Sequence, residues 1–478
     1  MTLRSAIFQS ASLYLFKETI ITLQLFIKII LNQMQLSTDD KINFSNIGLM
    51  FVTAICAYFF PFETFLLAYA YLGPLHYLTE ISWLHDRNYF AKGKFDFFIL
   101  LTIGVLLSAA AFSKDFGWNE EVFNYFSRMN LFDKLLVFAL FSSLLFAFVK
   151  NIFVKIVSIL LIFVFVSGWL SPENASSQSD NTAIFALTSL VPTLIHVYLF
   201  TGFFMLFGAL KSRSKSGLYQ IMGFVIIPII LIFIMPVNLK KTNITDYGRN
   251  AHYADGNGFF ATNVSIIDHF NLIEDPVFTN RDFINLMREQ KFENLNSKYQ
   301  FISVSNYKLL VDSLNKRLNE AYIIRKQPVN STCPVDNLLL LIDKDGALAE
   351  FRERPIPSKQ ISGFSIEKYG SFVYSSTIGI MLMRFIAFAY LYHYLNWFSK
   401  TEIIRWHKIP KIRLVIILAI WILASVFYAY DYSLGLSLLF FLSFTHVLLE
   451  FPLNMVSVIG IGKETWSIMK NGFLIKKS

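Results

Sequence analysis

The sequence is poor in cysteine and in charged residues. Its 478 residues include only Cys56 and Cys333, too few for a disulfide framework and without the spacing of a cysteine metal site. Charged residues make up 16% of the chain and hydrophobic residues 55%, which is typical of a membrane protein. There is no glycine-rich phosphate loop, no nucleophile elbow, no HExxH motif and no repeat of constant period. Thiol, nucleotide and common hydrolase chemistry are therefore not indicated.

Long apolar runs are the main structural signal. A helix needs about 20 apolar residues to cross a hydrocarbon core of about 30 Å. The ten predicted spans cover residues 47–60, 62–85, 95–113, 131–149, 152–170, 184–210, 219–236, 371–398, 411–430 and 434–458. The first is short and is followed by Pro61, so a re-entrant element is the alternative there. Gly460 and Gly462 are expected to end the last helix.

The start of the chain lacks a further span. Residues 1–33 contain Lys17, Glu18 and Lys28 within an apolar pattern, which predicts a helix lying at the membrane interface. No short apolar core precedes a small-residue cleavage site there, so we expect no removable signal peptide.

The loops between the spans carry an asymmetric charge. Residues 86–94, 211–215 and 400–413 are rich in Lys and Arg, whereas residues 171–181 contain two acidic side chains and no basic ones. The positive-inside rule then places the basic loops and both termini in the cytoplasm of a bacterial inner membrane. Because the net charge of +9 is spread over these loops, we expect the lipid bilayer and not nucleic acid as the partner.

These patterns define the predicted fold class and domains. We predict an all-α polytopic membrane protein of about ten helices with one small extracytoplasmic α+β domain. Residues 34–236 would form a first bundle of about seven spans, and residues 371–478 a second segment of about three spans with a cytoplasmic tail. In the polar segment 237–370, amphipathic helices are predicted at 280–289 and 308–318, and a hairpin joins 338–342 to 347–351.

Ionisable side chains within the apolar spans are the strongest functional signal. Such groups are costly in a bilayer unless they are paired, hydrated or bound to metal. His76 and Glu80 lie four residues apart, on one helical face, and His446 and Glu450 repeat this spacing. His196 and His393 lie on two further spans, and all four histidines are nearer the basic ends. We predict that these histidines bind a metal.

The chemistry of this residue set favours iron. Neutral imidazoles and carboxylates suit iron and, less specifically, zinc, copper or manganese. Glu80 and Glu450 are the predicted catalytic residues, either as direct ligands or as partners that orient His76 and His446. A buried iron site suits an oxygenase whose apolar lipid or isoprenoid substrate enters from the bilayer.

Three other interpretations remain open. A secondary transporter would use the same residues as a proton or ion relay. A lipid-linked transferase would use a buried histidine as a general base. The spans could also serve only to anchor a partner-binding outer domain.

One family resemblance follows from the segment Gly73-Pro-Leu-His76-Tyr and the single histidines on separate spans. In these features the sequence resembles the bacterial Brp/Blh family of membrane β-carotene dioxygenases. The resemblance implies a histidine-bound iron that cleaves a carotenoid to retinal, with the ligand positions corresponding to His76, His196, His393 and His446. It covers the spans only. The chain departs from the family in having no HxxxH pair and in its additional outer segment.

Overall fold

A computed structural model describes residues 37–111, 120–171, 182–238, 244–254, 258–270, 272, 373–374, 376–400 and 408–473, together with four short strands. The chain divides into two compact units, one formed by residues 1–235 and 384–478 and the other by residues 236–383. The predicted interfacial helix at 1–33 lies outside the described residues.

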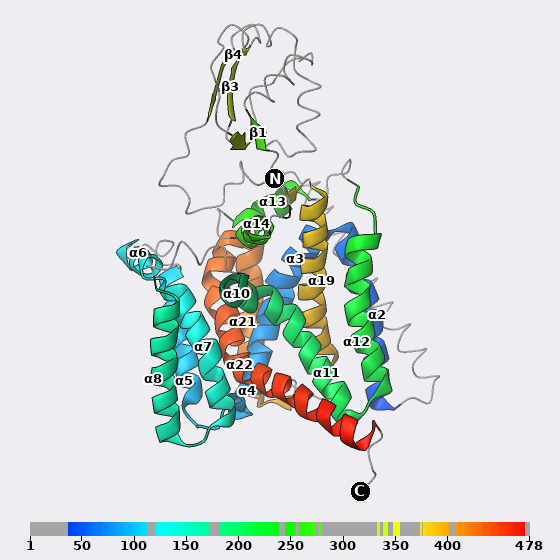
Figure 1. Ribbon diagram of the computed structural model, residues 1–478. Coiled ribbons are helices and arrows are strands. Elements are labelled where there is room, and N and C mark those ends of the chain that lie inside the picture. Colours follow the sequence, from blue (N-terminus) through cyan, green and yellow to red (C-terminus); the bar gives the residue numbers. More distant parts are fainter. Residues whose placement is uncertain are drawn as a thin grey trace. The chain divides into compact units, whose positions relative to one another are not determined.

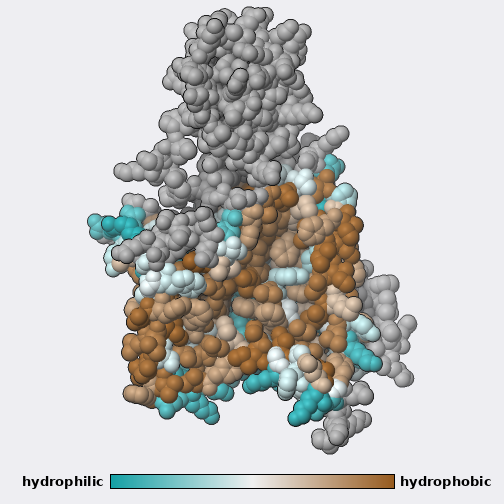
Figure 2. All heavy atoms as spheres, in the orientation of Figure 1, coloured by the Kyte–Doolittle hydropathy of each residue, from teal (hydrophilic) through white to brown (hydrophobic). Residues whose placement is uncertain are grey.

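The first unit is a bundle of helices (Figure 1). Within the described residues, eight helical segments are long and apolar enough to cross a membrane, and the chain is therefore a helical, multi-pass membrane protein. These are α2 (Thr38–Phe59), α7 (Leu131–Phe148), α8 (Ile152–Trp169), the run of α10 (Thr182–Phe185), η4 (Ala186–Phe200) and α11 (Thr201–Ser212), the run of α12 (Lys215–Ile229) and η5 (Ile230–Ile234), α19 (Thr377–Ser399), α21 (Lys411–Tyr430) and α22 (Tyr432–Asn471). Figure 2 shows the apolar residues that cover the sides of this bundle.

Two other predicted spans are also helical. The run 62–85 consists of α3 (Pro61–Leu67), the π-helix η1 (Ala68–Leu72) and α4 (Gly73–His85). The short α5 (Asp96–Ala111) follows the 3₁₀ turn η2 (Asn88–Phe90), and the amphipathic α6 (Glu120–Arg128) precedes α7. Neither run meets the length and hydropathy of the eight spans, so the total of ten stays a prediction.

Helix α2 is longer than the predicted span 47–60. Its N-cap is Ser37, whose side chain accepts a hydrogen bond from the Asp40 amide. The negative charges of two aspartates in its first turn interact favourably with the positive end of the helix dipole. The polar residues before position 47 are therefore helical, and the 22-residue helix is long enough for a full crossing.

Helix α22 is the centre of the bundle. It packs against α4, α5, α7, α11 and α21. The expectation that Gly460 and Gly462 end it is wrong, because the helix continues to Asn471. A Cβ atom at Gly460 would lie 2.4 Å from the Phe207 ring, so this glycine permits close packing of α22 on α11.

A buried ion pair fastens the start of α5 to α8. The ammonium of Lys155, in an apolar span, pairs with the Asp96 carboxylate, which also accepts a hydrogen bond from the Gly93 amide. The Lys155 side chain is buried. An isolated charge would be very costly at this position, so the pair fixes the register of the two helices.

The second unit contains α13 (Asp246–Tyr253) and α14 (Phe259–His269) and two antiparallel strand pairs. Strand β1 (Val277–Thr279) pairs with β2 (Thr332–Pro334), and β3 (Leu338–Ile342) pairs with β4 (Leu348–Glu353), where a hairpin is predicted. The predicted helices at 280–289 and 308–318 lie outside the described residues, so the α+β class of this segment stays a prediction.

The close contact at Gly460 gives a test of the packing. We expect Gly460→Val to lower the thermal stability of the purified protein, because the added side chain must push Phe207 or α22 aside; overpacking of this kind costs about 1–3 kcal/mol. Gly462→Val is the matched control, since no atom lies within 4 Å of a Cβ built there. Equal melting temperatures for both variants in a fluorescence melt would contradict the assigned contact.

Candidate metal centre

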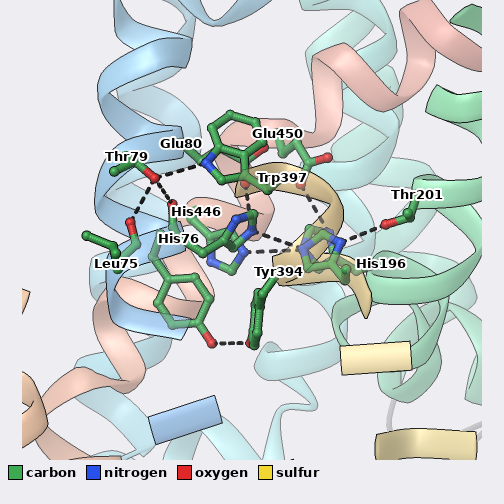
Figure 3. A network of polar contacts seen from close by, with 12 residues as sticks. Leu75, His76, Thr79, Glu80, His196, Thr201, Tyr394, Trp397, His446 and Glu450 are labelled. Carbon is green, nitrogen blue, oxygen red and sulfur yellow. Dashed lines mark hydrogen bonds and ion pairs between the residues drawn. The ribbon is translucent and has the colours of Figure 1, made fainter. Parts of the chain in front are cut away.

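Four histidines from four different helices meet inside the first unit (Figure 3). His76 lies on α4, His196 on η4, His393 on α19 and His446 on α22. Their exposed fractions are 1%, 2%, 6% and 2%, so all four rings are closed off from solvent. The structure therefore brings together the four predicted ligands.

The helices that carry these histidines are locally irregular. The π-helix η1 and Pro74 come just before His76, and His196 lies in the 15-residue π-helix η4, which also contains Pro192. Pro452 interrupts α22 six residues after His446. A π-helix inserts extra residues and changes the direction of the side chains that follow, and such segments are frequent at functional sites.

The four rings face one another through their Nε2 atoms. Nε2 of His393 lies 3.0 Å from Nε2 of His76, and Nε2 of His446 lies 3.2 Å from Nε2 of His196. Ring centres are 4.6 Å apart for His76 and His393, and 5.2 Å apart for His393 and His196. The other two ring-centre distances are 5.1 Å from His196 to His446 and 5.5 Å from His446 to His76, so each ring has two others as neighbours.

These separations fit four ligands of one ion. With a metal–nitrogen bond of about 2.1 Å, adjacent donor nitrogens lie about 3.0 Å apart at right angles and about 3.4 Å apart in a tetrahedron. The ring centre lies about 1.2 Å beyond the donor nitrogen, so the same two geometries predict distances between ring centres of about 4.7 and 5.4 Å. The observed nitrogen and ring distances fall in or beside these ranges. The ring arrangement is therefore compatible with a shared ion, and the donors that all lie within 4.8 Å of one another are those of His76, Glu80 and His446.

The outer nitrogens of two rings have polar partners. Nδ1 of His393 is hydrogen-bonded to Thr201 Oγ1 at 2.7 Å. Nδ1 of His196 lies 3.3 Å from Oε2 of Glu450, within ion-pair distance but without the geometry of a hydrogen bond. When Nδ1 carries the proton and donates to such an oxygen, Nε2 is left with its lone pair toward the cluster. This arrangement of imidazole and outer acceptor is the usual one for metal-binding histidines.

The two glutamates have different positions. Oε2 of Glu80 lies 2.9 Å from His76 Nε2, on the inner side of the cluster. Donor atoms of Glu80, His76 and His446 all lie within 4.8 Å of one another, so Glu80 can be a further ligand. The sequence spacing predicts that Glu450 orients His446, its neighbour on α22, but its carboxylate approaches His196 instead. Both carboxylates are buried.

Aromatic and hydroxyl side chains enclose the cluster. The Tyr77 ring stacks on His446 with centres 4.2 Å apart, and its hydroxyl is 2.8 Å from that of Tyr394. Trp397 donates a hydrogen bond to Thr79 and lies against His76. Every described ring in contact with the four histidines belongs to His, Tyr or Trp.

The sequence interpretation missed these enclosing residues and Thr201. A signal for two of them was present, because His76 and His393 are each followed directly by tyrosine. Thr201 carried no such signal, since its contact with His393 joins α11 to α19.

One cation lies near the site. Lys400 follows the last residue of α19, and its charge is close enough to interact with His393. Burial lowers the pKa of the Lys400 amine to about 8. By contrast, His85 is exposed beside Asp86 and takes no part in the cluster.

The comparisons with known proteins give no assignment. No family model, no curated protein and no solved structure matches this chain. The resemblance to the Brp/Blh family therefore stays an expectation from the sequence.

The outer partners give a test of the centre. We expect Glu450→Gln to weaken the binding of Co²⁺, used as a spectroscopic probe, by about 10- to 100-fold, because an amide holds the His196 proton less strongly than a carboxylate does. Thr201→Val should have a smaller effect in the same direction. Binding would be measured by titration of cobalt absorption in detergent. Glu464→Gln, on the same helix but far from the cluster, is the control, and equal affinities in all proteins would exclude these roles.

Proposed function

We propose that this protein is an integral membrane metalloenzyme, an iron-dependent oxygenase that acts on an apolar lipid or isoprenoid. The observation that carries the proposal is the convergence of four buried Nε2 atoms from four helices. Glu80 on the inner side and Glu450 behind His196 complete the residue set.

A packing role accounts poorly for this cluster. Each pair of facing Nε2 atoms is either one hydrogen bond, when one ring carries its proton on Nε2, or two lone pairs that bind a cation. Nδ1 of His76 and Nδ1 of His446 have no hydrogen-bond partner among the described residues. Buried polar groups without good partners lower stability, and apolar side chains of equal volume would fill the same space at less cost. A bound cation turns all four lone pairs into favourable interactions.

Iron is favoured by the donors and by the surroundings. The site offers imidazole and carboxylate donors and no thiolate, a set that suits iron in oxygen chemistry. When bound, iron would supply the activation of dioxygen, while the protein supplies orientation and a water-poor cavity. In the carotenoid cleavage that the sequence resemblance implies, both oxygen atoms enter the two carbonyl products, so dioxygen is the only co-substrate.

The residues of the chain have separate roles in this proposal. Glu80 is a ligand or takes up a proton beside His76, and Glu450 and Thr201 hold the rings of His196 and His393. Tyr77, stacked on His446, separates the cluster from the rest of the core. An apolar substrate reaches the site from the bilayer, which surrounds the apolar sides of the bundle. We place the protein in an inner membrane with the basic loops and both termini in the cytoplasm.

Metal content is the direct test. We expect the detergent-purified protein to contain one iron per chain by mass spectrometry. Alanine substitution of any one of His76, His196, His393 or His446 should lower it several-fold, because each removes one donor. His85→Ala is the control, since that side chain is 60% exposed and lies outside the cluster.

The result also separates the other functions. Iron that is retained in all four variants would show that the histidines do not hold it. Protein without metal after anaerobic reconstitution would favour a transporter, to be tested by proton flux in liposomes with Glu80→Gln and Glu450→Gln. If iron is bound, dioxygen uptake with carotenoid and lipid substrates tests the oxygenase.

A further inference from the structure

A stripe of polar side chains continues along α22 beyond the metal centre. His446, Glu450 and Asn454 are four residues apart, and Ser457 follows after three more. This spacing places them on one face of the helix. Asn454 and Ser457 are each 1% exposed, so the stripe runs through the interior of the bundle and not along its lipid-facing surface.

Several polar atoms of this stripe have no protein partner. Neither Oδ1 nor Nδ2 of Asn454 forms a hydrogen bond with any described residue, and the same holds for Oε1 of Glu450. Buried side-chain amides and carboxylates are nearly always satisfied, by protein or by water. Asn396 lies one turn beyond His393 on α19, and its Oδ1 atom also forms no hydrogen bond with any described residue. The orphaned atoms therefore lie beyond histidines of the cluster on two helices.

Both helices lead from the cluster toward the same end of the bundle. Helices α19 and α22 run in the same direction, since α21 returns the chain between them, and the C-terminal part of α22 lies at the bottom of the bundle in Figure 1. At that end Arg213 of α11 pairs with Glu464 of α22 at 2.9 Å, and the Glu464 side chain is 27% exposed. Glu464 continues the polar face of α22, about 21 Å from Glu450 at 1.5 Å per residue.

We infer that a hydrated path follows this face of α22 and carries water between Glu450 and the aqueous end at Glu464. Water molecules bound to Glu450 and Asn454 on α22, and to Asn396 on α19, satisfy the orphaned atoms, since a buried water is held by two to four polar partners. Pro452 adds to the path, because it cannot donate to the Leu448 carbonyl and leaves that oxygen available. The path does not depend on which metal, if any, the histidines bind.

Cysteine accessibility tests this path directly. Because the sequence has only two cysteines, Cys56→Ser with Cys333→Ser gives a thiol-free background. In it, Asn454→Cys and Ser457→Cys are each treated with Ag⁺ in proteoliposomes, and the thiol that remains is titrated with maleimide after denaturation. We expect both to react at least about tenfold faster than a thiol in apolar surroundings, where the reactive thiolate is suppressed.

Met455→Cys is the matched control. Met455 lies at nearly the same depth as Asn454 but on a different face of the helix, and it packs against the apolar core although it is less buried. Reagent that arrives through lipid would thus reach the thiol of the Met455→Cys variant first. Slow reaction of both the Asn454→Cys and the Ser457→Cys variants, or equal rates for all three variants, would overturn the path. Elution volume and melting temperature, measured alongside, show whether each variant is folded, so a failed metal centre would leave this result unaffected.

Discussion

The cost of placing imidazole and carboxylate groups inside an apolar bundle is the constraint on which the rest of the structure depends. Each group is tolerated only where other polar groups meet it. His76 and Glu80 come from α4, His446 and Glu450 from α22, and the remaining two rings from η4 and α19. The relative depth and rotation of these four helices are therefore fixed at a single level. The long central α22 contacts α4, α5, α7, α11, α21 and η4, so it extends this arrangement through the bundle.

The irregular helices follow from the same constraint. A regular α-helix repeats its faces at fixed intervals, so it can present a side chain to the centre only at certain positions. The π-helix η4 changes this interval around His196, and Thr201 at its end then reaches His393. In a polar interior, the carbonyl oxygens that Pro192 and Pro452 free can accept hydrogen bonds from side chains or water, so these prolines are tolerated. The irregular helices and the polar centre thus occur in the same part of the bundle.

The sequence was sufficient to find the eight clear spans and the buried histidines and glutamates, but it did not single out the buried Lys155. Spacing places His76 with Glu80 on one face, and apolar length locates the eight clear spans. It could not assign Glu450 to His196, because that contact depends on ring rotation and on the packing of η4 against α22. The prediction that α22 ends at Gly460 and Gly462 was wrong for a similar reason. Glycine is common both at helix ends and at close helix crossings, and only the Phe207 ring, distant in sequence, decides between the two at Gly460.

A water-poor centre and a polar stripe on the same helix serve different needs. Exclusion of water strengthens every interaction between an ion and its ligands, because charges attract more strongly at low dielectric. The same exclusion would isolate the carboxylates from any proton donor. Glu450 lies at the boundary, with Oε2 toward His196 and Oε1 without a protein partner among the described residues. One carboxylate can therefore lie against the imidazole of His196 and also contact the hydrated path that we infer along α22, without opening the centre to bulk water.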